Sequence, residues 1–357
     1  MNYRQTTLLE QEDASTAATK TIDIDLSDII SRIQVKFNAT NNGHTPTDHP
    51  AKQISKIELV DGSDVLMSLS AQQIEALMFC NYKAGRHYEM EYRNDCENRM
   101  VLDILFGTKL WDPTLALDPK RFKNPQLKIT HNKALGGSAP DAATLEVFAD
   151  VFDEKTPSPV GFITAKEYHS YTAGSSASNE YIDLPNDYPI RRIGIQTYKA
   201  DSWWDNIVSE VELDEENKKR LPWSVDGYDL MQLAISKYGL YTEGLVGTMP
   251  AVNTLSVYVT PVEVVNCAVA GIGSNTNPFI NAEKVGGYIQ LNTTAVVAFR
   301  CLLGGPIPHG FVPLDCGDPW DPSDWYDVTK KGKVKLRVKA GASATVNVVL
   351  EQLRRYA

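Results

Sequence analysis

Five aspartates recur at every third position near the end of the chain, a spacing that could serve a cation. They are Asp315, Asp318, Asp321, Asp324 and Asp327. Clustered carboxylate oxygens are the ligands that Ca²⁺ prefers, although the run lacks the D-x-D-x-D-G spacing of an EF-hand. The interspersed prolines favour turns in which aspartate side chains accept hydrogen bonds from backbone N–H groups. We therefore predict turns in this segment, with a bound structural ion as the alternative.

The histidines and the glycine-rich loops match no catalytic or metal-binding motif. The six histidines are His44, His49, His87, His131, His169 and His309. None belongs to an H-E-x-x-H motif or lies at zinc-ligand spacing from a cysteine, and we expect His44 and His49 to be solvated in a loop. Residues 174–178 lack the G-x-S-x-G elbow of a serine hydrolase, and residues 271–275 lack the helix and lysine of a phosphate-binding loop. We assign no catalytic, cofactor-binding or metal-binding residue.

Two further groups of side chains could contact a ligand or a surface. The aromatic group consists of Trp203, Trp204, Trp320, Trp325 and Tyr326, and the basic group of Lys330, Lys331, Lys333, Arg354 and Arg355. Aromatic platforms can stack on sugar rings, but aromatic residues beside prolines more often pack under loops or fill a subunit contact. We interpret the basic residues as solvated strand ends, with attraction to a lipid surface or a genome as the alternative.

The composition is that of a globular chain and restricts its partners. The 357 residues are 43% hydrophobic, and 45 acidic against 35 basic side chains give a net charge of −10. This charge opposes contact between phosphates and the bulk surface, and we expect no sequence-specific nucleic-acid binding. The first 20 residues show no secretory signal, and the most apolar stretch, residues 257–273, is interrupted by Pro261 and Glu263 and is too broken to span a membrane.

The cysteines indicate the compartment in which the protein is made. The five are Cys80, Cys96, Cys267, Cys301 and Cys316, none closer than 15 residues to another. An odd, scattered set without a C-x-x-C pair predicts reduced, mostly buried thiols in a protein made in a cytoplasm. Two disulfides and one free thiol are the alternative.

The elements that must position all these residues are mostly strands. Alternation of apolar and polar residues recurs, most clearly at 21–37, 54–68, 144–152, 181–197 and 344–350. Only two helices are expected. One follows a capping box that begins at Ser70, and the other spans 226–237, where the same device is expected and Leu230, Leu233 and Ala234 share one face. Short strands without long helices between them argue against a parallel βαβ fold and favour sandwiches or barrels.

The two halves of the chain match each other in order. An offset of 160 lays residues 22–37 on 182–197, where Arg32 meets Arg192, and an offset of 156 superposes the two helices. Three more windows follow. An offset of 197 pairs Leu105 and Gly107 with Leu302 and Gly304, and an offset of 209 pairs Trp111-Asp112-Pro113 with Trp320-Asp321-Pro322. An offset of 201 pairs residues 144–150 with residues 345–351. Five windows in the same order predict a duplicated domain.

We therefore predict an all-β chain of two tandem eight-stranded jelly-roll β-sandwiches, each with a short helix, that is, a double jelly roll. The predicted divisions are 1–20 as an N-terminal arm, 21–167 as the first jelly roll, 168–180 as a linker and 181–357 as the second jelly roll. The second half is longer, with excursions at 239–253, 271–287 and 304–327.

The ordered set of segments, present twice in tandem, resembles the double jelly-roll major capsid proteins of tailless icosahedral viruses. The segments are TIDIDLSDIISRIQVKF, IELVDGSDVLMSLS and SAQQIEALMFCNY in the first half, and LPNDYPIRRIGIQTY and GKVKLRVKAGASATVNVVLEQLRRY in the second. The resemblance implies a structural, non-enzymatic virion protein of a bacteriophage. Such a protein needs no cofactor and is made in the cytoplasm of the host cell. An internal lipid membrane is a further implied partner of such a virus.

The same resemblance implies how the protein assembles. Three copies would form a homotrimer with six similar sandwiches in a ring, which tiles a shell beside neighbouring capsomers and penton or vertex proteins. The long excursions of the second half are then expected in an outer tower or in trimer contacts, and the arm beneath the shell. Two other functions stay open on the sequence: a two-domain β-sandwich carbohydrate-active enzyme or lectin, and a phage receptor-binding spike module.

Overall fold

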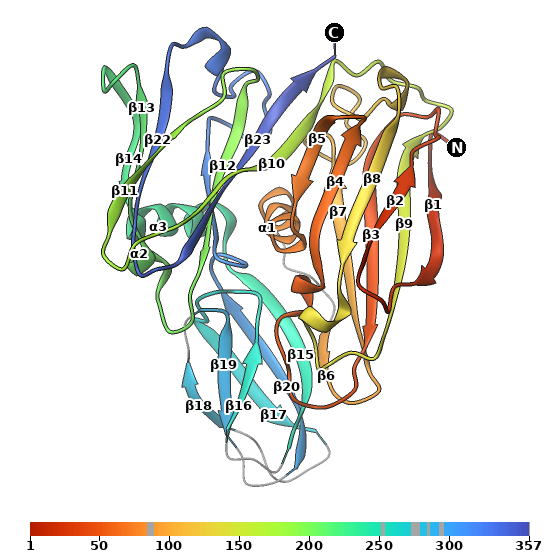
Figure 1. Ribbon diagram of the computed structural model, residues 1–357, viewed down its shortest axis with the longest axis vertical. Coiled ribbons are helices and arrows are strands. Elements are labelled where there is room, and N and C mark those ends of the chain that lie inside the picture. The colour runs from red at the N-terminus through yellow and green to blue at the C-terminus, as the bar shows by residue number, and fades with distance from the viewer. Residues whose placement is uncertain (84–88, 251–253, 273–278, 284–285, 293–295, 357) are drawn as a thin grey trace.

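Most of the chain is built from β-strands that form two sandwiches standing side by side, with a smaller β unit at one end of the second (Figure 1). The computed structural model describes residues 1–83, 89–250, 254–272, 279–283, 286–292 and 296–356. His87 and part of the 271–275 loop lie outside the described residues. The two halves are described first, because their equivalence positions every side chain discussed below.

The first sandwich has two layers of four strands. One layer has the order β1-β9-β3-β7 and the other β2-β8-β4-β5. The strands are β1 (Tyr3–Asp13), β2 (Ala18–Asp23), β3 (Ile30–Thr40), β4 (Ile54–Asp61), β5 (Asp64–Leu69), β7 (Glu97–Leu105), β8 (Pro125–His131) and β9 (Ala142–Phe152). The predicted alternation is clear in β3, where Ile33, Val35 and Phe37 are fully buried in the core and the residues between them face outward.

The second sandwich repeats this topology strand for strand. Its layers have the orders β10-β23-β12-β21 and β11-β22-β13-β14. The strands are β10 (Gly161–Thr172), β11 (Ser178–Asp183), β12 (Ile190–Tyr198), β13 (Val208–Glu215), β14 (Arg220–Asp226), β21 (Phe311–Asp315), β22 (Val334–Ala340) and β23 (Thr345–Arg355). In both sandwiches the first, eighth, third and sixth strands form one layer, and the second, seventh, fourth and fifth form the other. The predicted pair of eight-stranded jelly rolls is confirmed.

One helix follows the fifth strand of each sandwich, as predicted. Helix α1 (Ala71–Tyr82) begins at a complete capping box, in which Ser70 Oγ accepts from the Gln73 backbone N–H and Gln73 Oε1 accepts from the Ser70 backbone N–H. Helix α3 (Gly227–Tyr238) is confirmed, but the repeated capping device is not, because the Asp226 side chain makes no cap hydrogen bond. The remaining short helices are α2 (Trp204–Ile207), η1 (Pro50–Gln53), η2 (Pro119–Arg121), η3 (Lys133–Leu135) and η4 (Val328–Lys330).

The structure divides the chain at other places than predicted. The N-terminal arm is strand β1, paired antiparallel with β9, and two register shifts in β1 disrupt the alternation that would have revealed it. The linker expected at 168–180 contains the end of β10 and the start of β11, so only 173–177 is loop. Because β10 is the first strand of the second sandwich, the connection between the sandwiches is 153–160.

The excursions of the second half include a separate inserted unit. It contains β15 (Tyr241–Met249), β16 (Leu255–Tyr258), β17 (Asn266–Gly271), β18 (Phe279–Glu283), β19 (Tyr288–Asn292) and β20 (Val297–Gly305). Strand β6 (Glu89–Tyr92) of the first half joins it parallel to β15. The unit has its own core, which includes Leu245, Ile289 and Phe299, and it lies at the opposite end of the molecule from the C-terminus (Figure 1).

Four of the five repeat windows are structurally equivalent, and one is wrong. The offset of 197 pairs β7 with β20, whereas the strand order makes β21 the partner of β7. Strand β20 belongs to the inserted unit, and its apolar alternation resembles that of any buried strand. The offset of 209 is correct, and it also pairs Asp118 with Asp327, which cap η2 and η4 in the same way.

Candidate functional site

An arginine with two carboxylates occurs at the same place in both sandwiches. In the second, the Arg192 guanidinium on β12 contacts Asp315 of β21 at 2.8 Å and also pairs with Glu351 of β23. In the first, Arg32 on β3 contacts Asp103 of β7 at 2.9 Å and Asp150 of β9 at 2.7 Å. Each cluster therefore ties the third, sixth and eighth strands of its sandwich together. The sequence pairing of Arg32 with Arg192 anticipated this, although the carboxylates were not predicted.

The two clusters differ in burial. The Arg192 side chain is fully buried, and the Arg32 side chain keeps 18% of its surface exposed. Burial by itself raises the pKa of Asp315, but Arg192, Lys237 and the Tyr238 hydroxyl outweigh it, so the pKa lies below the ordinary value. Burial raises the pKa of Tyr82, the counterpart of Tyr238, to about 12, and Asp103 adds to the effect. These groups hold fixed charges and orient strands, which is a structural role.

Buried polar residues also meet where the two sandwiches join the inserted unit. Glu75 of α1 lies 2.9 Å from His309 Nε2, and the rings of His309 and His49 stand edge to face at 4.7 Å between centroids. His49 Nδ1 accepts from the Ala51 backbone N–H, so Nε2 carries the proton and donates to Thr260 at 3.0 Å. A cavity of about 350 Å³ adjoins these residues.

The expectation of a solvated His49 is wrong. Its side chain is buried, with 5% of the residue surface exposed, because the inserted unit covers the loop that carries it. His44 does lie in an exposed loop. No local pattern could have brought His49 and His309 together, because 260 residues separate them and an insertion completes the contact.

The aspartate run forms the predicted turns. Asp318 Oδ1 accepts from the Trp320 backbone N–H at 3.0 Å, and Asp321 Oδ1 accepts from the Ser323 N–H at 2.9 Å. Asp327 caps η4, and Asp315 belongs to the Arg192 cluster. In the described part of the chain, no three His, Cys, Asp or Glu side chains form a group that could hold a metal ion.

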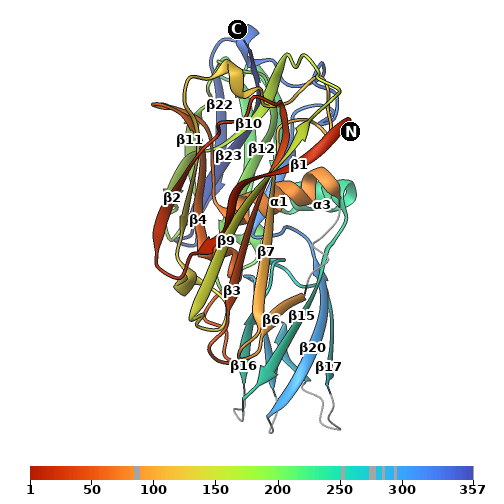
Figure 2. The same ribbon diagram turned by 90° about the vertical axis from the view of Figure 1, so that its right-hand side faces the viewer.

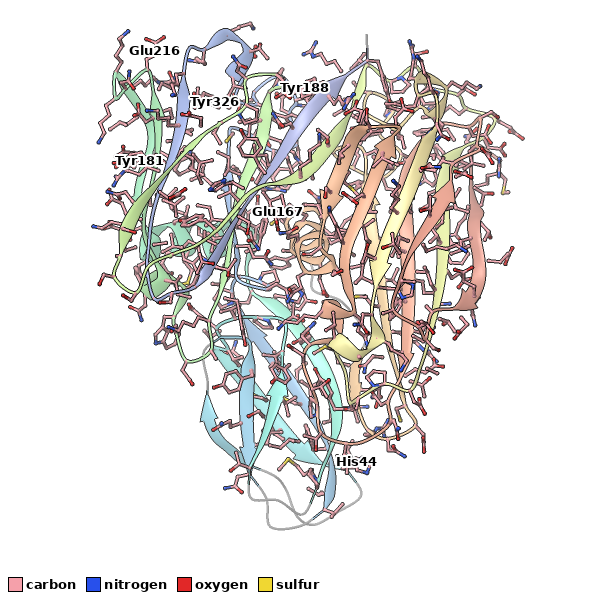
Figure 3. All side chains as sticks on the ribbon, in the orientation of Figure 1. His44, Glu167, Tyr181, Tyr188, Glu216 and Tyr326 are labelled. Carbon is pink, nitrogen blue, oxygen red and sulfur yellow. The ribbon has the colours of Figure 1, made fainter. Side chains whose placement is uncertain are left out.

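The aromatic group packs largely under loops, as predicted. Trp204 is fully buried and its Nε1 donates to the Gly310 carbonyl at 2.9 Å, and Trp325 is 4% exposed and donates to the Asp318 carbonyl at 3.0 Å. Tyr326 donates to Glu215 at 2.7 Å, and Figure 3 shows it at the end of the second sandwich far from the inserted unit. Trp203 is the exposed member, with 47% of its surface accessible.

Carboxylates accompany most of the basic group. Lys330 pairs with Asp327 at 2.7 Å, Lys331 with Glu215 at 3.4 Å and Lys333 with Asp183 at 3.1 Å. Arg354 pairs with Asp64 across the two sandwiches. These pairs reduce the positive potential that a phosphate or an anionic lipid would meet, so they favour the interpretation as strand ends.

All five cysteines are free thiols, and the Sγ atoms of Cys267 on β17 and Cys301 on β20 lie 3.3 Å apart on neighbouring strands. Cys80, Cys301 and Cys316 are buried, and burial raises the pKa of Cys80 and of Cys316 to about 12. Neither thiol is therefore a reactive nucleophile near neutral pH. In the described residues, the longest helices are too short and too polar to cross a bilayer.

Helix burial provides the clearest difference between the two halves. Residues Gln73 to Leu77 of α1 are all buried, because the helix lies between the two sandwiches (Figure 1). Helix α3 has no such cover. Leu233, which the sequence pattern placed on its buried face, keeps 49% of its surface exposed, and Tyr228 keeps 55%.

Two sandwiches of identical strand order, each followed by a helix at the same place, define the double jelly-roll fold. Comparison with solved structures identifies the proteins that share it. The crystal structure of the STIV MCP matches with a TM-score of 0.62 and 12% sequence identity, over 99% of this chain and 98% of that chain. The major capsid protein P2 from bacteriophage PM2 matches with a TM-score of 0.58 and 10% identity, over 99% and 98%.

A third match extends the same fold to another virus. PBCV-1 VP54 has a TM-score of 0.57 and 11% identity, over 99% of this chain and 94% of that chain. No protein-family model and no curated protein sequence matches the chain. This protein therefore has the double jelly-roll fold of viral major capsid proteins along its whole length, with little sequence in common.

Proposed function

We propose that this protein is the major capsid protein of a tailless icosahedral virus, a structural subunit without enzymatic activity. The observation that carries the proposal is the whole-chain match to double jelly-roll capsid proteins, which covers 98% of the STIV MCP and of PM2 P2 as well. The same strand order and the same helix in both halves support this role, because an enzyme would normally keep one catalytic unit and one divergent accessory domain.

The polar groups of the molecule support a structural role. The two arginine clusters tie strands together, and the Glu75–His309 pair joins units of the chain. The aspartates of the 315–327 segment accept hydrogen bonds within their own turns or pair with Arg192. These side chains are thus engaged in holding the fold.

The proposed assembly unit is a homotrimer in which six sandwiches form a pseudo-hexagonal ring. Such rings tile a closed shell at positions with six neighbours, beside neighbouring capsomers and penton or vertex proteins. The inserted unit projects from one end of the sandwiches and supplies a tower on one surface of that shell (Figure 1). The protein would then reside in the virion, after synthesis in the host cytoplasm, and a bacteriophage with an internal lipid membrane is one such virus.

Light scattering coupled to size exclusion tests the proposal on the purified chain. The expected mass is about 119 kDa, three times the 39.6 kDa of one chain, and electron microscopy of concentrated samples should show shells or sheets of trimers. A glycan-hydrolysing monomer would contradict the proposal and support the carbohydrate-active alternative. A trimer that binds host cells and never forms shells would also contradict it and support the spike module.

A further inference from the structure

Two cysteines of the inserted unit lie in contact on neighbouring strands. The Sγ atoms of Cys267 on β17 and Cys301 on β20 are 3.3 Å apart. The two strands are antiparallel, and their register places Cys267 opposite Leu303, two residues along β20 from Cys301. The thiols are therefore diagonal neighbours on one face of the sheet, and diagonal side chains of an antiparallel pair lie close enough to interact.

Both thiols face the core of the inserted unit. Cys301 is fully buried in that core, whereas Cys267 is partly exposed and packs against it. The alternation along β20 supports this orientation, because the next residue, Leu302, points to the outer face and is 63% exposed. The sulfur pair thus has a closed side at Cys301 and a side at Cys267 that a small molecule in solution can reach.

The geometry of the pair favours a covalent bond over a metal site. A structural zinc ion takes four ligands from cysteine, histidine or carboxylate side chains. Across the part of the chain that the structure describes, no three such side chains are grouped closely enough to hold an ion. Two thiols in contact can instead be joined directly, and their sulfur atoms need to approach by roughly 1 Å to reach the length of a disulfide bond.

Strand β17 can make this small movement because it lies at the edge of its sheet. The sheet has the order β17-β20-β15-β6, so β17 is paired on one side, with β20 (Figure 2). An edge strand has no ladder on its outer side. A shift of Cys267 toward Cys301 therefore moves β17 over the face of β20 without separating it from another strand of this sheet.

We propose that Cys267 and Cys301 form a disulfide that ties β17 to β20 when the protein passes from a reducing to an oxidising medium. This inference goes beyond the proposed function and does not depend on it, because it concerns a single chain. A cytoplasm keeps both thiols reduced, whereas an extracellular medium permits the bond. The bond would join positions 34 residues apart and restrict the unfolded forms of the segment that carries β18 and β19.

The oxidant is a small disulfide, for which oxidised glutathione is the probe. The Cys267 thiol loses its proton, and its sulfur attacks one sulfur of the oxidant and expels one glutathione thiolate. The Cys301 sulfur, after losing its own proton, then attacks Cys267 Sγ and releases the second glutathione. Two protein thiols are thereby oxidised to one disulfide, and the oxidant is reduced to two thiols that take up the two protons.

The two steps should depend on pH. Contact with Cys267 and burial raise the pKa of the Cys301 thiol above its ordinary value. Because the thiolate is the attacking form, closure of the bond should be faster in alkaline solution.

Thiol counting on the full chain tests the bond. The protein is purified in a reductant, transferred to oxidised glutathione at pH 8, then denatured and labelled with N-ethylmaleimide. We expect three labelled cysteines where the reduced chain has five, together with the loss of two hydrogen atoms from the intact mass. Tandem mass spectrometry should place the link between positions 267 and 301, and dithiothreitol should restore all five thiols.

Two serine variants of buried cysteines provide the matched comparison. Cys301→Ser removes one partner and should form no internal disulfide under the same oxidation. Cys80→Ser replaces a cysteine of similar burial, 2% exposed against 0% for Cys301, and should still form the bond and leave two thiols to label. Oxidation should raise the melting temperature of the parent chain and of Cys80→Ser by several degrees and leave that of Cys301→Ser unchanged.

The possible results separate this inference from the proposed function. Five labelled cysteines after oxidation, a link at other positions, or a glutathione that stays on Cys267 of the parent chain would overturn the disulfide. Trimers and shells can form in each of these cases, so the capsid role is judged by the scattering and microscopy experiments alone. A monomer that forms the 267–301 link would support the disulfide and contradict the capsid role.

Discussion

Replacing Arg192 by leucine should destabilise the protein more than the same change at Arg32, because the Arg192 side chain is fully buried and the Arg32 side chain is 18% exposed. Arg192 is fully buried against Asp315 and Glu351, and the leucine variant would leave each buried carboxylate with one remaining cation, Lys237 at 2.8 Å from Asp315 and Arg191 at 3.3 Å from Glu351. Breaking a buried pair by removing one partner costs about 3–5 kcal/mol. Arg32 occupies the equivalent position but keeps 18% of its side chain exposed, and Asp103 and Asp150 keep 11% and 8%. Exposed pairs contribute about 1 kcal/mol or less and buried pairs cost about 3–5 kcal/mol to break, which places the cost of Arg32→Leu between these values.

Denaturant unfolding of both variants and the parent chain, at one protein concentration and at pH 7, measures the two free energies. We expect the midpoint of Arg192→Leu to fall clearly below that of Arg32→Leu. Equal losses would refute the argument that burial determines the cost. Acid provides a second measurement. The pKa of Asp315 lies below its ordinary value of 3.8, so its contribution is complete above that pH and is lost as the pH falls further through the folded-state pKa. Without Arg192 the folded-state pKa of Asp315 should lie closer to 3.8, so this acid-side loss of stability should become smaller.

Three further predictions concern β1, the aspartate turns and the thiols. Deleting residues 1–13 removes an edge strand that pairs along β9, so it should lower the melting temperature or prevent folding, whereas a free arm would leave melting unchanged. The double variant Asp318→Ala with Asp321→Ala removes two hydrogen bonds that these side chains accept from backbone N–H groups. Its free energy of unfolding, measured by calorimetry, should fall by about 0.5–2 kcal/mol for each bond, and a chelator should not change this result. A chelator that lowers the stability of the parent chain would reveal a bound ion. Cys80 and Cys316 should resist alkylation at pH 8 in the folded protein and react after unfolding, as mass spectrometry can show; rapid labelling of the folded chain would contradict their burial.

The sequence predicts the parts of this fold that local pattern determines. Period-two alternation identifies β3 and β12, the capping box identifies α1, and their equivalence across the halves leads to two jelly rolls. Strand β1 escapes this approach because it is a half-exposed edge strand with two register shifts, so neither burial nor spacing marks it. The sequence window that wrongly aligns β7 with β20 has a similar origin, since the apolar pattern of a single strand does not show which strands lie beside it.

The contacts between distant parts of the chain could not be predicted in this way. His49 is buried by a unit inserted some 200 residues later, and the carboxylates around Arg192 come from two other strands. Leu233 is the informative exception. Its helical spacing predicts burial, whereas the single chain leaves 49% of its surface exposed.

Cryo-electron microscopy of the assembled protein tests the central claim most directly, because one map shows both the subunit and its neighbours. The account predicts closed shells built from rings of six similar sandwiches, with three chains and three towers in each ring. Particles without such rings, or a protein that forms no particles, would contradict the proposed capsid function.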